Sequence, residues 1–198
     1  MIPILNIKID TMTSRDSLVT NRVKFNSQLL IKYVFDFRKE NKDVGPNVIK
    51  ICKVKVKRTG GTILAHYYAK IYLSNNFEFE FHPGSQPRTF QTMNNADSTV
   101  VKVLLLCDNC CKRELTDYVD GENKFNIAFQ NCESILCKRK SVQTVIGVAL
   151  VVLLISNIIE FKLFHMVLIA FLVALLYMTN NYMLHHPMVR TCEHLKNT

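Results

Sequence analysis

Apolar residues are concentrated in one long stretch near the C-terminus. Residues 142 to 159 form an uncharged run of 18 residues, which spans about 27 Å as an α-helix and so just crosses the hydrocarbon of a bilayer. A second uncharged run, residues 163 to 178, follows after Glu160-Phe161-Lys162. The pattern predicts a transmembrane helical hairpin of two short spans, over 142–159 and 163–178. The alternative is one span followed by a helix that lies in the membrane interface.

Helical periodicity also occurs before this tail. Ser27 can cap a helix that runs through about Glu40, because apolar residues recur there at helical spacing (Leu29, Leu30, Tyr33, Val34 and Phe37). A second helix is expected to begin at about Asn131 and to run toward the first span. Asp120-Gly121 is typical of a turn.

Alternating or continuous apolar residues predict a small sheet between these helices. The expected strands cover residues 48–57, 63–73, 77–82 and 99–107. Turn residues at Gly60-Gly61 and Ser74-Asn75-Asn76 separate the first three strands, which therefore predict an antiparallel meander. In the third strand, Glu78, Glu80 and His82 share the face opposite the phenylalanines.

These elements predict the α+β class, with a small antiparallel sheet packed against helices and followed by the transmembrane hairpin. The predicted organisation is an N-terminal arm and helix (1–47), an α+β head (48–140), the hairpin (141–179) and a C-terminal tail (180–198).

Charge indicates the orientation of the tail and its surroundings. Residues 1–140, the arm and the head together, carry 22 of the 25 basic and 14 of the 16 acidic residues, a net charge of 22 minus 14, or +8. Lys138-Arg139-Lys140 directly precedes the first span, which by the positive-inside rule keeps the head on the cytosolic or nucleoplasmic side. A basic head beside a membrane favours anionic lipid as its partner, and no direct nucleic-acid partner is expected.

Seven cysteines and no predicted secretory signal indicate free thiols, metal ligands or a nucleophile in a reducing compartment. Cys107, Cys110 and Cys111 have a spacing that can supply zinc thiolates. The second half of such a site is missing nearby, since the remaining candidates are Cys137 and Cys192-Glu193-His194, the latter beyond the membrane segment. We therefore expect no metal ion or other cofactor. Cys107, Cys110 and Cys111 are instead expected to be free thiols at the end of a buried strand.

Two histidines and one further cysteine suggest nucleophilic chemistry. His66 lies within a predicted strand, His82 ends the next strand, and Cys132 lies at a predicted helix start. Paired antiparallel strands can bring the histidines together, and a helix N-terminus lowers the pKa of a thiol. These are the parts of a Cys-His nucleophile, so Cys132 is expected to be the most acidic and reactive of the seven thiols.

The order of these residues resembles the lecithin retinol acyltransferase-like branch of the permuted papain-like fold. The resemblance rests on a strand histidine, His82-Pro83, and Asn131-Cys132-Glu133 followed by a hydrophobic anchor. It implies that His66 is the base, that His82 orients it, and that Cys132 forms an acyl-thioester with a phospholipid acyl chain. Ser134 stands where that family has a further histidine.

Longer blocks from His66 to Arg139 resemble the baculovirus core protein family named for open reading frame eighty-one of the type virus. They include F-E-F-E-F-H-P-G-S-Q-P-R-T-F-Q, C-D-N-C-C-K-R-E-L and F-Q-N-C-E-S-I-L-C-K-R. The resemblance implies a late viral membrane protein that acts in nucleocapsid envelopment and virion morphogenesis in the infected nucleus. Its expected partners are membrane lipid and other viral envelope or nucleocapsid proteins, and the virion envelope is a further expected location.

Two functional hypotheses remain open. The chain is either a non-catalytic membrane protein that serves envelopment by structure and interaction, on a papain-like or an unrelated small-sheet scaffold, or a lipid-directed thiol phospholipase or acyltransferase. They differ on whether His66 and His82 face Cys132.

Overall fold

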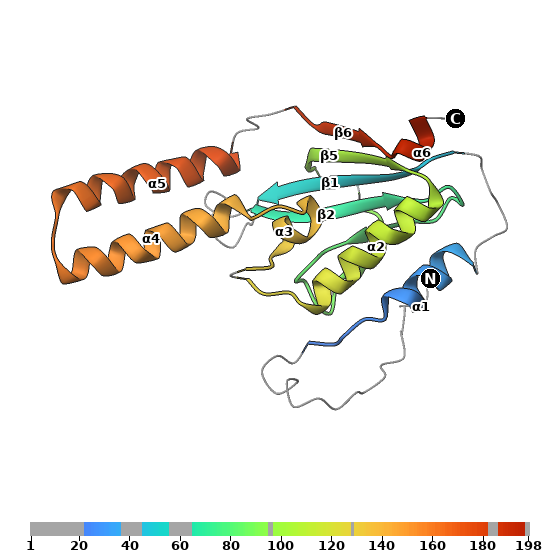
Figure 1. Ribbon diagram of the computed structural model, residues 1–198, viewed down its shortest axis with the longest axis horizontal. Coiled ribbons are helices and arrows are strands. Elements are labelled where there is room, and N and C mark those ends of the chain that lie inside the picture. The colour runs from blue at the N-terminus through green and yellow to red at the C-terminus, as the bar shows by residue number, and fades with distance from the viewer. Residues whose placement is uncertain are drawn as a thin grey trace.

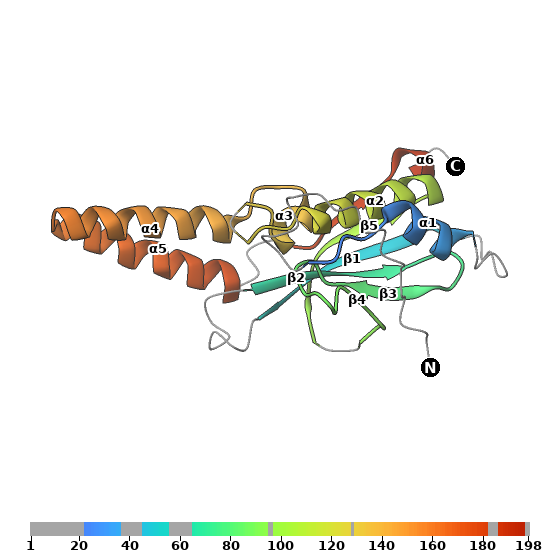
Figure 2. The same cartoon turned by 90° about the horizontal axis from the view of Figure 1, so that it is seen from below.

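The computed structural model describes residues 22–36, 45–55, 65–94, 97–127, 129–181 and 186–196. Its centre is a six-stranded sheet in the order β4-β3-β2-β1-β5-β6 (Figures 1 and 2). The strands are β1 (Asn47–Lys55), β2 (Ala65–Tyr72), β3 (Glu78–Phe81), β4 (Phe90–Gln91), β5 (Thr99–Leu106) and β6 (Met188–Thr191). Within these described ranges six helices accompany them: α1 (Ser27–Phe35), α2 (Asp108–Asn123), α3 (Cys132–Cys137), α4 (Val142–Ile159), α5 (Leu163–Asn181) and α6 (Glu193–Lys196). The α+β class is therefore confirmed.

The sheet is antiparallel from β4 to β5 and parallel at its last pair. β1 pairs with β2, β2 with β3, and β3 with β4, all antiparallel, as the predicted meander requires. β5 pairs with the other side of β1. β6, from the segment after α5, then pairs parallel with β5, so that Val103 lies opposite Val189. The sheet is mixed rather than wholly antiparallel, because the chain returns to the head after its apolar helices.

Helices α1, α2 and α3 cover one face of the sheet, and the main core lies between them and the strands (Figure 2). Alternate residues of the central strands point into it, as a half-buried pleated sheet requires. The largest fully buried apolar side chains of this core come from both layers (Val34, Ile49, Ile51, Ile71, Phe81, Tyr118, Val119 and Leu136).

Helix α2 was not predicted, and the predicted turn at Asp120-Gly121 is wrong because both residues lie inside it. Most of α2 is polar, but its buried residues recur at helical spacing (Cys111, Leu115, Tyr118, Val119 and Glu122). Gly121 serves close packing, since a Cβ there would lie 2.9 Å from Cγ2 of Ile135 in α3. A glycine that suggests a turn in the sequence thus lets two helices approach.

The helix expected from Asn131 toward the first span is two helices. Lys138 has a φ of 53° in the left-handed region, which ends α3, and Ser141 caps the new helix α4 by accepting from the backbone N–H of Thr144. The predicted extension of the first helix beyond residue 36 and the turn at Gly60-Gly61 lie outside the described residues.

Helices α4 and α5 lie side by side and project from one end of the head (Figures 1 and 2). They are 18 and 19 residues long, with mean hydropathies of 2.4 and 2.0. Over the 18-residue apolar window of each helix, only 6% of α4 and 11% of α5 is buried inside the molecule. Their length, composition and exposure match the two predicted apolar segments, and they are long and apolar enough to cross a membrane.

Candidate functional site

The predicted nucleophile lies where α3, β2 and α4 meet, and its neighbours fasten these elements together. Asn131 caps α3, because its Oδ1 accepts from the backbone N–H of Ser134 at 3.1 Å. Its Nδ2 donates to Oγ1 of Thr144 at 2.7 Å. Asn131 therefore joins the start of α3 to the first turn of the apolar helix α4.

Glu133 supports the same junction from inside. Its side chain is 2% exposed, and it accepts from Nη2 of Arg139 at 3.0 Å and from the hydroxyl of Ser141 at 2.8 Å. A buried carboxylate is tolerated when it is paired and hydrogen-bonded in this way. Both motif residues beside Cys132 thus hold the connection between α3 and α4.

The thiol of Cys132 lies against the backbone of β2 and beside a cavity. Its Sγ accepts from the backbone N–H of Tyr67 at 3.5 Å. The cavity has a volume of about 480 Å³, and Ala65 and Cys132 line it together with mostly apolar residues of α4 and of the loop before α3 (Phe125, Ile127, Thr144, Val148, Val151 and Val152). The thiol therefore opens onto an apolar space that continues along the first apolar helix.

Burial raises the pKa of Cys132, and this effect outweighs the backbone N–H groups of Tyr67 and Glu133, which lower it. The expectation that Cys132 is the most acidic thiol is therefore wrong. By contrast, the pKa of Cys192 is lowered. Burial alone would raise this pKa, but hydrogen bonds with Cys107, Cys110 and the backbone of Leu195 lower it by more.

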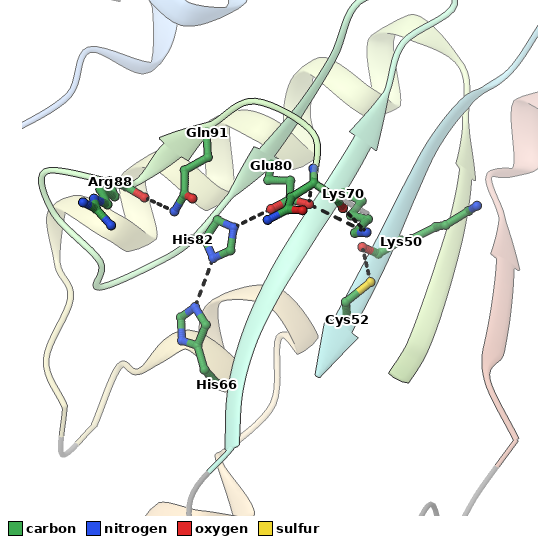
Figure 3. Close-up of polar contacts among 9 residues, drawn as sticks. Lys50, Cys52, His66, Lys70, Glu80, His82, Arg88 and Gln91 are labelled. Atoms are coloured by element: carbon green, nitrogen blue, oxygen red, sulfur yellow. Dashed lines mark hydrogen bonds and ion pairs between the residues drawn. The ribbon is translucent and has the colours of Figure 1, made fainter. Parts of the chain in front are cut away.

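The two predicted histidines form a hydrogen-bonded row with a carboxylate (Figure 3). Nε2 of His66 lies 3.4 Å from Nδ1 of His82, and Nε2 of His82 lies 2.9 Å from Oε2 of Glu80. If the ionised carboxylate accepts from Nε2–H of His82, then Nδ1 of His82 accepts from Nε2–H of His66, and Nδ1 of His66 keeps its lone pair. The row is thus built to fix the tautomer of His66.

Several contacts hold this row in place. Glu80 is buried, accepts from the backbone N–H of Asn94 at 3.0 Å, and lies 3.7 Å from Nζ of Lys70. The ring of Tyr68 stacks on His82 with centroids 4.5 Å apart. Burial, and to a lesser degree His82, lowers the pKa of His66 to about 4, so His66 is neutral near pH 7.

The structure brings His66 and His82 together but does not bond either to Cys132. Successive strand residues point to opposite faces, and Tyr67 belongs to the core beneath the helices, against which Cys132 packs. His66 projects in the opposite sense, toward Tyr68 and His82. Among the described residues no hydrogen bond joins Cys132 to a histidine, so the catalytic roles of the three remain predictions.

Glu80 was not assigned to the site from the sequence, and the cysteine ligands were named without a prediction of which of them lie together. Glu80 shares a strand face with His82, which the alternation already indicated. Of the three candidate zinc thiols, Cys111 is fully buried in the core, whereas Cys107 and Cys110 lie beside Cys192 and His194. That cluster depends on β6 pairing with β5, which no local pattern signals.

Comparison with known proteins covers nearly the whole chain. The family model described as Baculoviridae AC81 matches residues 22–195. "Protein AC81" of Autographa californica nuclear polyhedrosis virus is 46% identical over 190 residues, 94% of this chain and 81% of that protein. The "Uncharacterized 24.9 kDa protein" of Orgyia pseudotsugata multicapsid polyhedrosis virus is 46% identical over 188 residues, 93% of this chain and 86% of its own length. No solved structure matches significantly. The chain belongs to the Baculoviridae AC81 family.

Proposed function

We propose that this viral protein is a membrane anchor and interaction factor for nucleocapsid envelopment and virion morphogenesis, the role that the resemblance implies. The observation that carries the proposal is the exposed apolar pair α4 and α5, attached to a folded head. Large apolar side chains exposed to this extent on two adjacent helices need a nonaqueous environment, which a bilayer provides.

The head is fixed to this pair by several hydrogen bonds. Gln143 of α4 accepts from the backbone N–H of Ala65 at 3.1 Å and donates to the Ala65 carbonyl at 3.2 Å. Nζ of Lys53 donates to the carbonyl of Thr179 near the end of α5 at 3.0 Å. Both apolar helices are thus tied to the sheet, which would hold the head at a set orientation against the membrane surface.

The proposed location follows from charge and topology. Lys138-Arg139-Lys140 before α4 favours the cytosolic or nucleoplasmic side for the head of an integral membrane protein. The pairing of β6 with β5 supports a hairpin whose two ends lie on that same side. The partners would be membrane lipid and other viral envelope or nucleocapsid proteins, with no direct nucleic-acid contact, in host membranes and the virion envelope.

This role can be tested in a virus whose gene for this protein is replaced by a variant with one arginine in each apolar helix. Leu154→Arg in α4 and Phe171→Arg in α5 place charges on exposed apolar positions. Each arginine near the centre of a span raises the free energy of membrane insertion by about 3 kcal/mol. We expect the protein to leave the membrane fraction on alkaline extraction and nucleocapsids to accumulate without envelopes. The matched control is Leu154→Ile with Phe171→Leu. Normal membrane retention and normal envelopment in the arginine variant would refute the proposal.

A second candidate function is lipid-directed acyl transfer, favoured by the apolar cavity between Cys132 and α4. In this reaction Sγ of Cys132 attacks the acyl carbonyl of a phospholipid, an S–C bond forms as the ester C–O bond breaks, and the lysophospholipid hydroxyl leaves with the thiol proton. Water or an acceptor hydroxyl then takes the acyl group and returns a proton to sulfur. For His66 to take the thiol proton, its side chain would first have to leave the face of β2 that it shares with Tyr68 and His82 and reach Cys132.

Intact-mass analysis after incubation with phospholipid vesicles tests this second function. An acyl adduct is expected on the purified chain and on Cys137→Ala, which removes another half-buried thiol of the same helix. The adduct should be absent from Cys132→Ala and formed more slowly by His66→Asn. A wild-type chain without any adduct, or an adduct that survives Cys132→Ala, would refute the acyl-enzyme while leaving the envelopment role intact.

A further inference from the structure

Four side chains with the chemistry of zinc ligands meet where β5 and β6 end. Cys107 directly follows β5, and Cys110 lies in the first turn of α2. Cys192 directly follows β6, and His194 lies in α6. Three thiol sulfurs and an imidazole nitrogen all lie within 4.8 Å of one another.

The parallel pairing of β5 and β6 explains why the four converge. Parallel neighbours end at the same edge of a sheet, so the residues after each strand emerge side by side. Each strand here is followed by a cysteine, then by a helix that carries the second ligand. The backbone N–H of Cys192 donates to the carbonyl of Leu105 at 2.9 Å, which fixes the two strand ends against each other.

The distances suit one tetrahedral ion. Zn–S bonds of about 2.3 Å and Zn–N bonds of about 2.0 Å place a sulfur and a nitrogen about 3.5 Å apart in a tetrahedral site. Nδ1 of His194 lies 3.4 Å from Sγ of Cys110 and 3.8 Å from Sγ of Cys107. The side chains need little movement to accept the ion.

The surroundings also fit a metal thiolate. The backbone N–H of Cys107 donates to Sγ of Cys192 at 3.3 Å, and such outer bonds orient metal ligands. All seven cysteines are free thiols. In the reducing compartment that the family's proposed location implies, three adjacent thiols are more readily held by a metal than by a disulfide.

We propose that Cys107, Cys110, Cys192 and His194 bind one Zn²⁺ ion that clamps the segment after the apolar hairpin to the head. Four protein ligands fill a tetrahedral shell and leave no position for substrate, so the site is structural. The Cys107-x-x-Cys110 half is formed by one continuous strand and helix. Binding of Cys192 and His194 then couples metal affinity to the docking of β6.

Metal content of the full-length chain, purified in detergent under reducing conditions, tests the site. We expect about one zinc ion per chain, with Cys110→Ser, Cys192→Ser and His194→Ala each lowering the content at least roughly fivefold. Cys111→Ala is the matched control, because it removes the adjacent thiol, whose side chain lies in the core. His194→Cys restores a fourth ligand and should keep the metal.

A second measurement avoids dependence on mutant folding. Co²⁺ added to the metal-free wild-type chain should give the visible absorption of a tetrahedral site with thiolate ligands, and Zn²⁺ should displace it. Removal of zinc by a chelator should expose the segment after α5 to protease. Absence of bound metal and of the cobalt spectrum from the reduced wild-type chain would overturn the proposal, as would full zinc retention by Cys192→Ser.

Discussion

Asn131, Cys132 and Glu133 are consecutive residues with different physical roles. The asparagine caps α3 and reaches Thr144, while the buried glutamate binds Arg139 and Ser141. The resemblance implied a nucleophile with two supporting motif residues, but the side chains of Asn131 and Glu133 have a structural role in the junction with α4. Burial also decides the pKa of the thiol, which a motif does not encode. The sequence thus located the cluster, whereas contacts and burial determine what its members can do.

His66 should make stability depend on pH in a defined window. Its pKa is about 4 in the folded chain, chiefly because of burial, against an ordinary value of 6.5. Between these values the unfolded chain binds more protons than the folded one, so the folded state loses stability as the pH falls from about 6.5 to about 4. Thermal unfolding of wild type and His66→Gln across this range measures the effect. The variant should show a shallower dependence, and equal slopes would contradict the assignment.

The success of prediction at the level of elements depended on how local each signal is. The strands β1, β2, β3 and β5 overlap their predicted ranges because alternation and turn residues lie within each segment. Helix α2 was not predicted because most of its residues are polar and Gly121 suggested a turn, although its buried residues recur at helical spacing. The four residues of β6 carry no clear period of their own, and their partner β5 is far away in the chain. The sequence named Cys107, Cys110, Cys192 and His194 as candidate ligands but did not predict that they converge, because the two halves of the cluster meet only through that pairing.

The cap of α3 can be tested separately from any chemistry of Cys132. Asn131→Ala removes both the acceptor for the Ser134 N–H and the donor to Thr144, so we expect a loss of about 1 to 2 kcal/mol in the free energy of unfolding. Asn131→Asp keeps an acceptor for the cap and should lose less. Chemical denaturation of the purified chains measures both. An alanine variant as stable as wild type would show that the junction does not depend on this cap.

At the scale of the whole molecule, the apolar hairpin interrupts the head rather than following it. The chain leaves the head after α3, passes through α4 and α5, and returns to add β6 to the same sheet (Figure 1). Each end of the hairpin is therefore fixed to one folded body. The predicted C-terminal tail (180–198) contains β6, which is part of the sheet of the head.

Topology gives a direct test of this arrangement. Because β6 and the head belong to one sheet, a tag at the N-terminus and a tag after Thr198 should lie on the same side of the membrane. Protease treatment of sealed microsomes should digest both tags or protect both. Digestion of one alone would show a single span and would contradict the pairing of β6 with β5 in the membrane-bound protein.

The position of β6 after α5 in the chain imposes an order on biosynthesis. Strands β1 to β5 leave the ribosome first, and both apolar helices follow before β6 is made. Until then β5 is an edge strand, whose unpaired backbone groups can bind chaperones or other chains. The head is completed only by a chain that has already turned back through the hairpin. If the helices insert as proposed, a copy whose last segment lies on the wrong side of the membrane would keep this edge of β5 unpaired.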